Sequence, residues 1–150
     1  MESRLTERAY EQNKEILEVE SGLFQMSLFD NASDELMEYV LQDSLEESHT
    51  AFQAGTLKLY ELWCSGDEEA VIATLNEEED MDETEKALND EYQQIMITNR
   101  NAGMLEVAKG YLESGKTVFF AVGLAHLLQG NGLVQGLRDA GYTVELVTYA

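Results

Sequence analysis

The sequence predicts a mainly helical α/β protein whose small, partly parallel sheet ends in a βαβ unit. The apolar run within 117–122, Val-Phe-Phe-Ala-Val, has no polar alternation, which is typical of a strand buried on both faces. An amphipathic helical pattern follows Asn131 and stops at Gly141, and a last strand is expected at 142–148. Because a strand, a helix and a strand in this order form a parallel pair, we expect a right-handed crossover between the two strands.

The segments before this unit are expected to be mostly helical. Residues 3–13 form a charged helical pattern, and the short apolar run at 14–19 is expected to form the first strand of the sheet. Long helices are expected between this strand and the second. Their helical patterns lie at 21–29, 36–52, 57–66, 67–75 and 85–111. A break between the second and third of these patterns is expected near Gly55. The chain has no proline, which would interrupt such helices.

Local signals place several helix ends. Asn31 or Ser33 can cap the next helix, and Asp67, directly after the helix-ending Gly66, is a good N-cap. The acidic run at 77–83 is expected to be a solvated linker between two helices. It does not match an EF-hand loop, because no glycine stands at the turn position.

The composition suits one domain and excludes several partners. A chain of 150 residues with 44% apolar residues can bury a core. Its net charge of −21 argues against nucleic acid and against an anionic membrane surface, because Lys and Arg drive both kinds of binding. The single cysteine, Cys64, excludes an internal disulfide. No stretch has the roughly 20 apolar residues of a membrane span, and the charged start is unlike a signal peptide.

A positively charged side chain interrupts an apolar helical face. Arg100 lies between Met96 and Met104 at helical spacing, so it is either a surface residue with a covered stem or a buried guanidinium that needs an acid. Glu18, within the first strand, is either exposed or that acid, and Glu20 shares its face by strand alternation. We therefore expect Arg100 to pair with one of these two glutamates.

A histidine follows the second strand. His126 ends the loop Gly123-Leu124-Ala125-His126, and ligands gather at the carboxyl ends of strands in βαβ units, although a single histidine there can equally be structural. The other histidine, His49, lies in a polar helical stretch and is interpreted as a surface residue. The chain has no G-x-S-x-G, H-E-x-x-H or P-loop motif, so it gives no support to a serine hydrolase, a zincin or an NTPase.

The loop that contains His126 also resembles a known family. Residues 123–144, GLAHLLQGNGLVQGLRDAGYTV, are similar to the C-terminal GxxH block of the TraB/GumN family, which includes pheromone-shutdown proteins and is related to the Tiki metalloproteases. Three upstream segments resemble further motifs of the family in the same order: 14–21 its first strand, 62–67 its W-x-x-G-D corner, and 99–104 its R-N helix. The resemblance therefore covers nearly the whole chain.

The resemblance implies a metal-dependent hydrolase, of the peptidase kind by analogy with the Tiki branch. His126 would bind the metal or polarise the scissile group, and Glu18 would be a ligand or the general base. Arg100 would stabilise the oxyanion. The supporting residues are Glu20, as an alternative acid, Asn101, which would orient a neighbouring group, and Gly123 of the GxxH loop.

The metal implied by the resemblance is Mn²⁺, Co²⁺ or Zn²⁺, which carboxylates and a neutral imidazole can bind. A catalytic metal has about three protein ligands, whereas this chain offers only His126 and Glu18 as candidates. The sequence therefore predicts neither a bound metal nor hydrolase activity for the chain alone.

Family members have an earlier half with a first GxxH motif and further acidic residues. This chain starts just before the strand at 14–19, so we expect residues 1–150 to be one domain, the C-terminal part of a longer protein. An unpaired sheet edge in such a part predicts a homo-oligomer. The alternative function is a module that binds or sequesters a peptide without cleaving it. The compartment of the parent protein, including export or membrane association, is left open.

Overall fold

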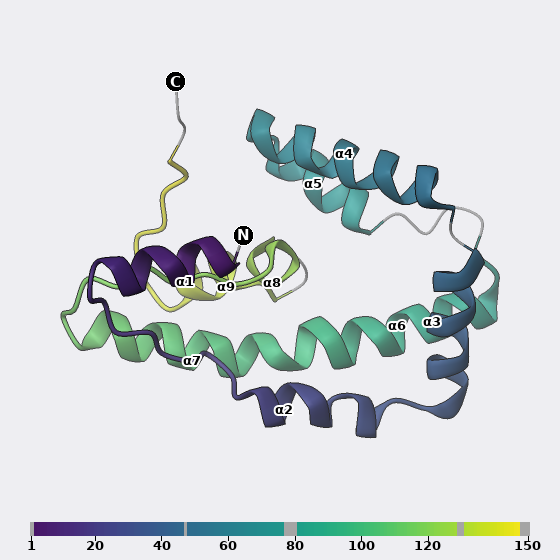
Figure 1. Ribbon diagram of the computed structural model, residues 1–150, viewed down its shortest axis with the longest axis horizontal. Coiled ribbons are helices and arrows are strands. Elements are labelled where there is room, and N and C mark those ends of the chain that lie inside the picture. The colour runs from purple at the N-terminus through teal and green to yellow at the C-terminus, as the bar shows by residue number, and fades with distance from the viewer. Residues whose placement is uncertain (1, 47, 77–80, 129–130, 148–150) are drawn as a thin grey trace.

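The computed structural model describes residues 2–46, 48–76, 81–128 and 131–147, and it is 72% helical. One long helical rod runs across the molecule, with a helical hairpin and a cluster of short helices on one side of it (Figure 1). In chain order, the elements are α1 (Glu2–Glu11), α2 (Gly22–Ser27), the 3₁₀-helix η1 (Phe29–Asn31), α3 (Asp34–Glu46), α4 (His49–Ser65), α5 (Glu68–Leu75), α6 (Glu83–Gln93), the π-helix η2 (Gln94–Thr98), α7 (Asn99–Glu113), α8 (Leu124–Leu128) and α9 (Leu133–Asp139).

The predicted α/β fold is wrong, because none of the described residues forms a β-strand. The expected strands at 14–19, 117–122 and 142–147 are irregular segments without ladder partners, and residue 148 lies outside the described part of the chain. There is accordingly no parallel pair and no βαβ crossover among the described residues. A strand forms only where a neighbouring strand pairs with its N–H and C=O groups. A β-branched apolar run indicates that the backbone prefers an extended conformation but does not supply that neighbour.

The longest element is the helical rod formed by α6, η2 and α7, which confirms the helical pattern at 85–111. It begins with a capping box: Asp82 Oδ1 accepts from the backbone N–H groups of Thr84 and Glu85, and Glu85 Oε2 accepts from the Asp82 N–H. The rod ends before Gly115, which has a positive φ of 69°. The π-helical turn η2 lies in the middle of the rod, one turn before Arg100.

The other helices pack along this rod. Helix α3 packs against α6, and α9 packs against α7, while α8 contacts α9, η2 and α5. Met104 and Ala108 of α7 and Leu133 of α9 are buried in this region. A Cβ atom on Gly136 would lie 2.8 Å from Leu105 Cδ2, so the glycine allows α9 to lie close against α7. The core is therefore a thin layer between the rod and the short helices.

Several predicted helix ends are confirmed. Ser33 Oγ accepts from the Leu36 N–H at 3.1 Å, and Asp67 Oδ1 accepts from the Ala70 N–H at 3.0 Å. Gly66, with φ of 72°, ends α4. The expected break near Gly55 is wrong, because α4 is continuous and instead begins with Ser48 as its N-cap. Most of the acidic run lies outside the described residues.

Of the helices in the described ranges, none combines the length and the apolar character that crossing a bilayer requires.

Candidate functional site

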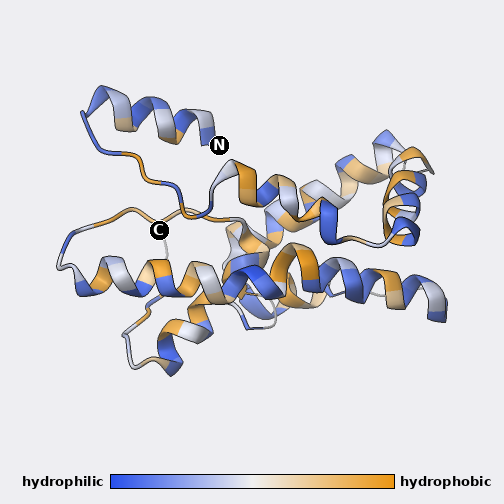
Figure 2. Cartoon of the chain, turned by 90° about the horizontal axis from the view of Figure 1, so that it is seen from below, coloured by the Kyte–Doolittle hydropathy of each residue, from blue (hydrophilic) through white to orange (hydrophobic). Residues whose placement is uncertain are grey.

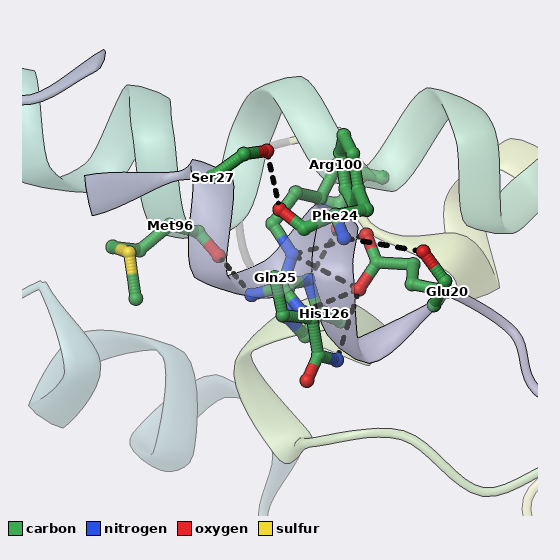
Figure 3. Close-up of polar contacts among 9 residues, drawn as sticks. Glu20, Phe24, Gln25, Ser27, Met96, Arg100 and His126 are labelled. Atoms are coloured by element: carbon green, nitrogen blue, oxygen red, sulfur yellow. Dashed lines mark hydrogen bonds and ion pairs between the residues drawn. The ribbon is translucent and has the colours of Figure 1, made fainter. Parts of the chain in front are cut away.

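Side chains from three distant segments meet beside the first turn of α7. Arg100 comes from α7, Glu20 from the segment before α2, and His126 from α8 (Figure 3). Arg100 Nε donates to Glu20 Oε1 at 3.1 Å and Oε2 at 3.2 Å, and Arg100 Nη2 donates to Oε2 at 2.6 Å. The side chain of Arg100 is 12% exposed and that of Glu20 is 9% exposed, so the two form a bidentate, largely buried ion pair.

The surrounding backbone holds this pair in place. Arg100 Nη1 donates to the backbone carbonyl of Met96 at 2.8 Å, and Met96 lies in the π-helical turn η2. Gln25 Nε2 of α2 donates to Glu20 Oε2 at 3.4 Å (Figure 3). Ser21, next to Glu20, caps α2 by accepting from the Phe24 N–H. A π-turn frequently marks a functional site, and here it presents a carbonyl to the guanidinium.

The Glu20 carboxyl remains ionised at neutral pH. Burial by itself raises the pKa of Glu20, but the hydrogen bonds from Arg100 and Gln25 and the positive charge of Arg100 outweigh burial and hold the pKa below its ordinary value. The ion pair is therefore preserved down to mildly acidic pH.

His126 is buried, at 6% exposed, and its ring is oriented by an amide. His126 Nδ1 lies 2.8 Å from Asn101 Oδ1, while Asn101 Nδ2 donates to Asn131 Oδ1 at 3.2 Å. An amide oxygen only accepts, so we assign the proton to Nδ1, which leaves the lone pair on Nε2. Asn101, at 1% exposed, thus connects His126 to the loop before α9.

The imidazole of His126 is neutral at pH 7. Burial lowers the pKa of His126, the positive charge of Arg100 lowers it further, and the negative charge of Glu20 offsets this only in part. A neutral imidazole with a fixed tautomer can accept a proton or donate a lone pair at Nε2.

The predicted site residues separate into two groups. Arg100, Asn101, His126 and Glu20 come together, and the predicted ion pair of Arg100 is confirmed with Glu20. Gly123 supports the loop, because its carbonyl accepts from the His126 N–H at 3.1 Å. Glu18 is exposed and is not the acid that contacts Arg100.

One histidine lies outside the cluster, whereas some residues that the sequence did not single out belong to it. His49 is exposed at the start of α4, as expected of a surface residue. Asn131 could have been recognised as a candidate site residue, because it lies in the Gly-Asn-Gly stretch after the GxxH loop. It was interpreted only as the start of a helix. The Met96 carbonyl gave no signal, because its contact with Arg100 lies within the rod at a π-helical turn that the sequence did not indicate. Gln25 gave none, because its contact with Glu20 depends on the placement of α2.

The donor set does not fit a catalytic metal. Within the described ranges, no three His, Cys, Asp or Glu side chains are grouped to hold an ion. His126 offers one nitrogen, whereas the Glu20 carboxylate is engaged by Arg100 and Glu18 is exposed. About three protein ligands are needed for a catalytic metal, so these residues do not form a centre for Mn²⁺, Co²⁺ or Zn²⁺ by themselves.

These features define a helical protein with a buried cluster of an ion pair and an amide-oriented histidine. The model of the TraB/PrgY/gumN family matches residues 1–146, so the chain belongs to that family. Neither a curated protein nor a solved structure shows a significant match to the chain.

Proposed function

We propose that the chain supplies one half of a peptide-hydrolysing site, with His126 as its reactive group. The proposal is supported mainly by one contact, the 2.8 Å approach of His126 Nδ1 to Asn101 Oδ1. This contact fixes the tautomer in which Nε2 is the proton acceptor, and the lowered pKa of His126 keeps the ring neutral. Nε2 would then take the proton of a water molecule that attacks the peptide carbonyl.

Arg100 is proposed to stabilise the negative charge that develops on the carbonyl oxygen. A guanidinium has five N–H groups, and the contacts to Glu20 and Met96 use three of them. Within the described residues this leaves one N–H on each terminal nitrogen of Arg100 for an oxyanion. Glu20 would act as a positioning residue, because it fixes the guanidinium plane.

A second half is needed for catalysis. The protonated His126 can return its proton to the leaving amine, but Glu20 is engaged by Arg100, and the described residues offer fewer than the about three ligands that a catalytic metal needs. We therefore propose that residues 1–150 are one domain that works as the C-terminal part of a longer family protein. By itself, this chain would bind a peptide without hydrolysing it.

A non-catalytic role for the same cluster is the alternative. The ion pair neutralises much of the charge of Arg100, and the described residues contain no cluster of three His, Cys, Asp or Glu side chains that could hold a metal ion. Both observations favour a module that recognises a peptide through its backbone carbonyl and does not cleave it.

The test is a comparison of the two histidines. The full chain and its His126→Gln and His49→Gln variants are incubated with a library of unstructured peptides, with and without Mn²⁺, Co²⁺ or Zn²⁺; fluorescence measures binding and mass spectrometry measures cleavage. We expect His126→Gln to weaken binding by about tenfold or more and His49→Gln to leave it unchanged. Equal binding by the two variants, or no binding by the parent chain, contradicts the role of the cluster. Cleavage by the chain alone contradicts the half-site.

A further inference from the structure

Three extended segments have backbones without partners. For residues 15–19, 117–122 and 143–147, no backbone hydrogen bond to another described residue is present. Each segment carries exposed apolar side chains: Leu17 is 52% exposed, Phe119 80% and Val147 68%. The stretches that lead into α2 and α8 accordingly contain hydrophobic residues that stand away from the helices (Figure 2).

The area of the chain shows how much surface is left uncovered. Its accessible surface is 11458 Å², whereas a compact monomer of 16.9 kDa has about 7,700 Å². An obligate dimer interface buries roughly 2,000–5,000 Å² in total, or roughly half of that on each chain. The excess of about 3,800 Å² on one chain is therefore large enough for an interface of obligate size.

The charge of these segments suits association with an identical surface. The segments 15–19, 117–122 and 143–147 contain three glutamates and no lysine or arginine, and Lys14 and Lys116 directly precede the first two, so the segments together with these two lysines have a net charge of −1 out of −21 for the chain. Two copies that met here would therefore associate through a weakly charged surface, where their mutual repulsion is small. A strongly basic partner would instead be attracted to the acidic helices.

We propose that these segments pair with the same segments of a second copy of this chain, in an intermolecular β-sheet. A two-fold axis brings the same surface of both copies together and can pair a segment with its own copy in antiparallel order. Pairing supplies the N–H and C=O groups of both copies with hydrogen bonds and buries Phe119, Leu17 and Val147. The proposal concerns residues 1–150 by themselves, without the further part proposed above; it rests on surface and backbone alone and does not depend on the proposed peptide site.

Assembly would also order the site. Glu20 follows the segment 15–19 directly, and Gly123, which bonds the His126 backbone, follows 117–122. If both segments were held in a sheet, the backbone that leads to Glu20 and to the loop of His126 would be held in place as well.

Two exposed apolar residues provide a matched test. Phe119→Lys places a charge in the proposed sheet, whereas Leu45→Lys places the same charge at a residue of α3 that is 78% exposed. Sedimentation equilibrium and amide I infrared spectra are recorded for the full chain and both variants, and circular dichroism checks that the helices are retained. Val147→Lys tests a second segment independently.

We expect the parent chain to have twice the mass of 16.9 kDa and an infrared band of intermolecular β-structure. Phe119→Lys and Val147→Lys should each weaken dimerisation by about tenfold or more, and Leu45→Lys should not change it. A monomeric parent chain overturns the proposal, as does a dimer without the β band. Dissociation by Leu45→Lys but not by the other two variants would place the interface on the helices and overturn it as well.

Discussion

Glu20 and Glu18 are two residues apart, yet they belong to regions with opposite properties. The carboxylate of Glu20 lies in a cluster, where it is bonded to the guanidinium of Arg100, and the charge of Arg100 lowers the pKa of both Glu20 and His126. Glu18 lies in an extended segment whose backbone has no partner among the described residues. Among the described residues, the buried polar side chains all have hydrogen-bond partners, whereas the extended segments that lead to the cluster have backbone groups without partners.

The largest expected effect comes from breaking the ion pair on the arginine side. Arg100→Ala leaves the Glu20 carboxylate buried without a cation, so we expect a loss of about 3–5 kcal/mol in the free energy of unfolding. Chemical denaturation measures it, with Arg138→Ala, on the exposed face of α9, as the matched control. The control should change stability by about 0.5 kcal/mol or less. A loss below about 1 kcal/mol for Arg100→Ala would show that the pair is not effectively buried.

A smaller effect distinguishes the two glutamates. Glu20→Gln keeps the side-chain shape but removes the charge that accepts from Arg100, and hydrogen bonds to charged groups contribute about 1.5–3 kcal/mol. Glu18→Gln should change the free energy of unfolding by less than about 0.5 kcal/mol, because the side chain is exposed. Both are measured by urea denaturation. Equal losses for the two variants would contradict the assignment of Glu20 as the partner.

Acidification should destabilise the chain in two steps. Because the folded-state pKa of His126 is lowered, the unfolded chain binds more protons as the pH falls below about 6.5, and stability decreases from there until the folded-state pKa is passed. The pKa of Glu20 is also lowered, so its contribution is lost only as the pH falls from about 4.5 through its folded-state pKa. Denaturation at a series of pH values checks both steps. His126→Gln should remove the first step and His49→Gln should keep it.

The helices and their caps could be predicted because their signals are local. Asp67 caps α5 through a residue three positions ahead, and the apolar spacing at 85–111 is a property of one helix. The sheet could not be predicted in this way, because the pattern at 117–122 indicates an extended chain but not its pairing partner. The break expected near Gly55 failed for a related reason, since one glycine costs only about 1 kcal/mol in a helix.

The site was predicted where residue chemistry decided it. A buried guanidinium needs an acid, so Arg100 pointed to a glutamate from sequence alone. Strand alternation did not decide between the two glutamates, because residues 19–20 form a bend and the segment before them has no sheet that defines faces. Asn131 and Gln25 join the cluster only through the placement of the loop before α9 and of α2. Such contacts depend on tertiary packing, for which the sequence has no local signal.

The most direct measurement is the nitrogen-15 NMR spectrum of the two imidazoles as a function of pH. For His126 we expect a neutral ring at pH 7, with the proton on Nδ1 and the lone pair on Nε2, and a pKa below the ordinary value of about 6.5 for histidine. Asn101→Ala should abolish the preference for this tautomer, whereas Asn99→Ala, at an exposed neighbouring residue, should not. A proton on Nε2 at pH 7, or a pKa of His126 above about 6.5, would contradict the proposed role of His126 as the proton acceptor.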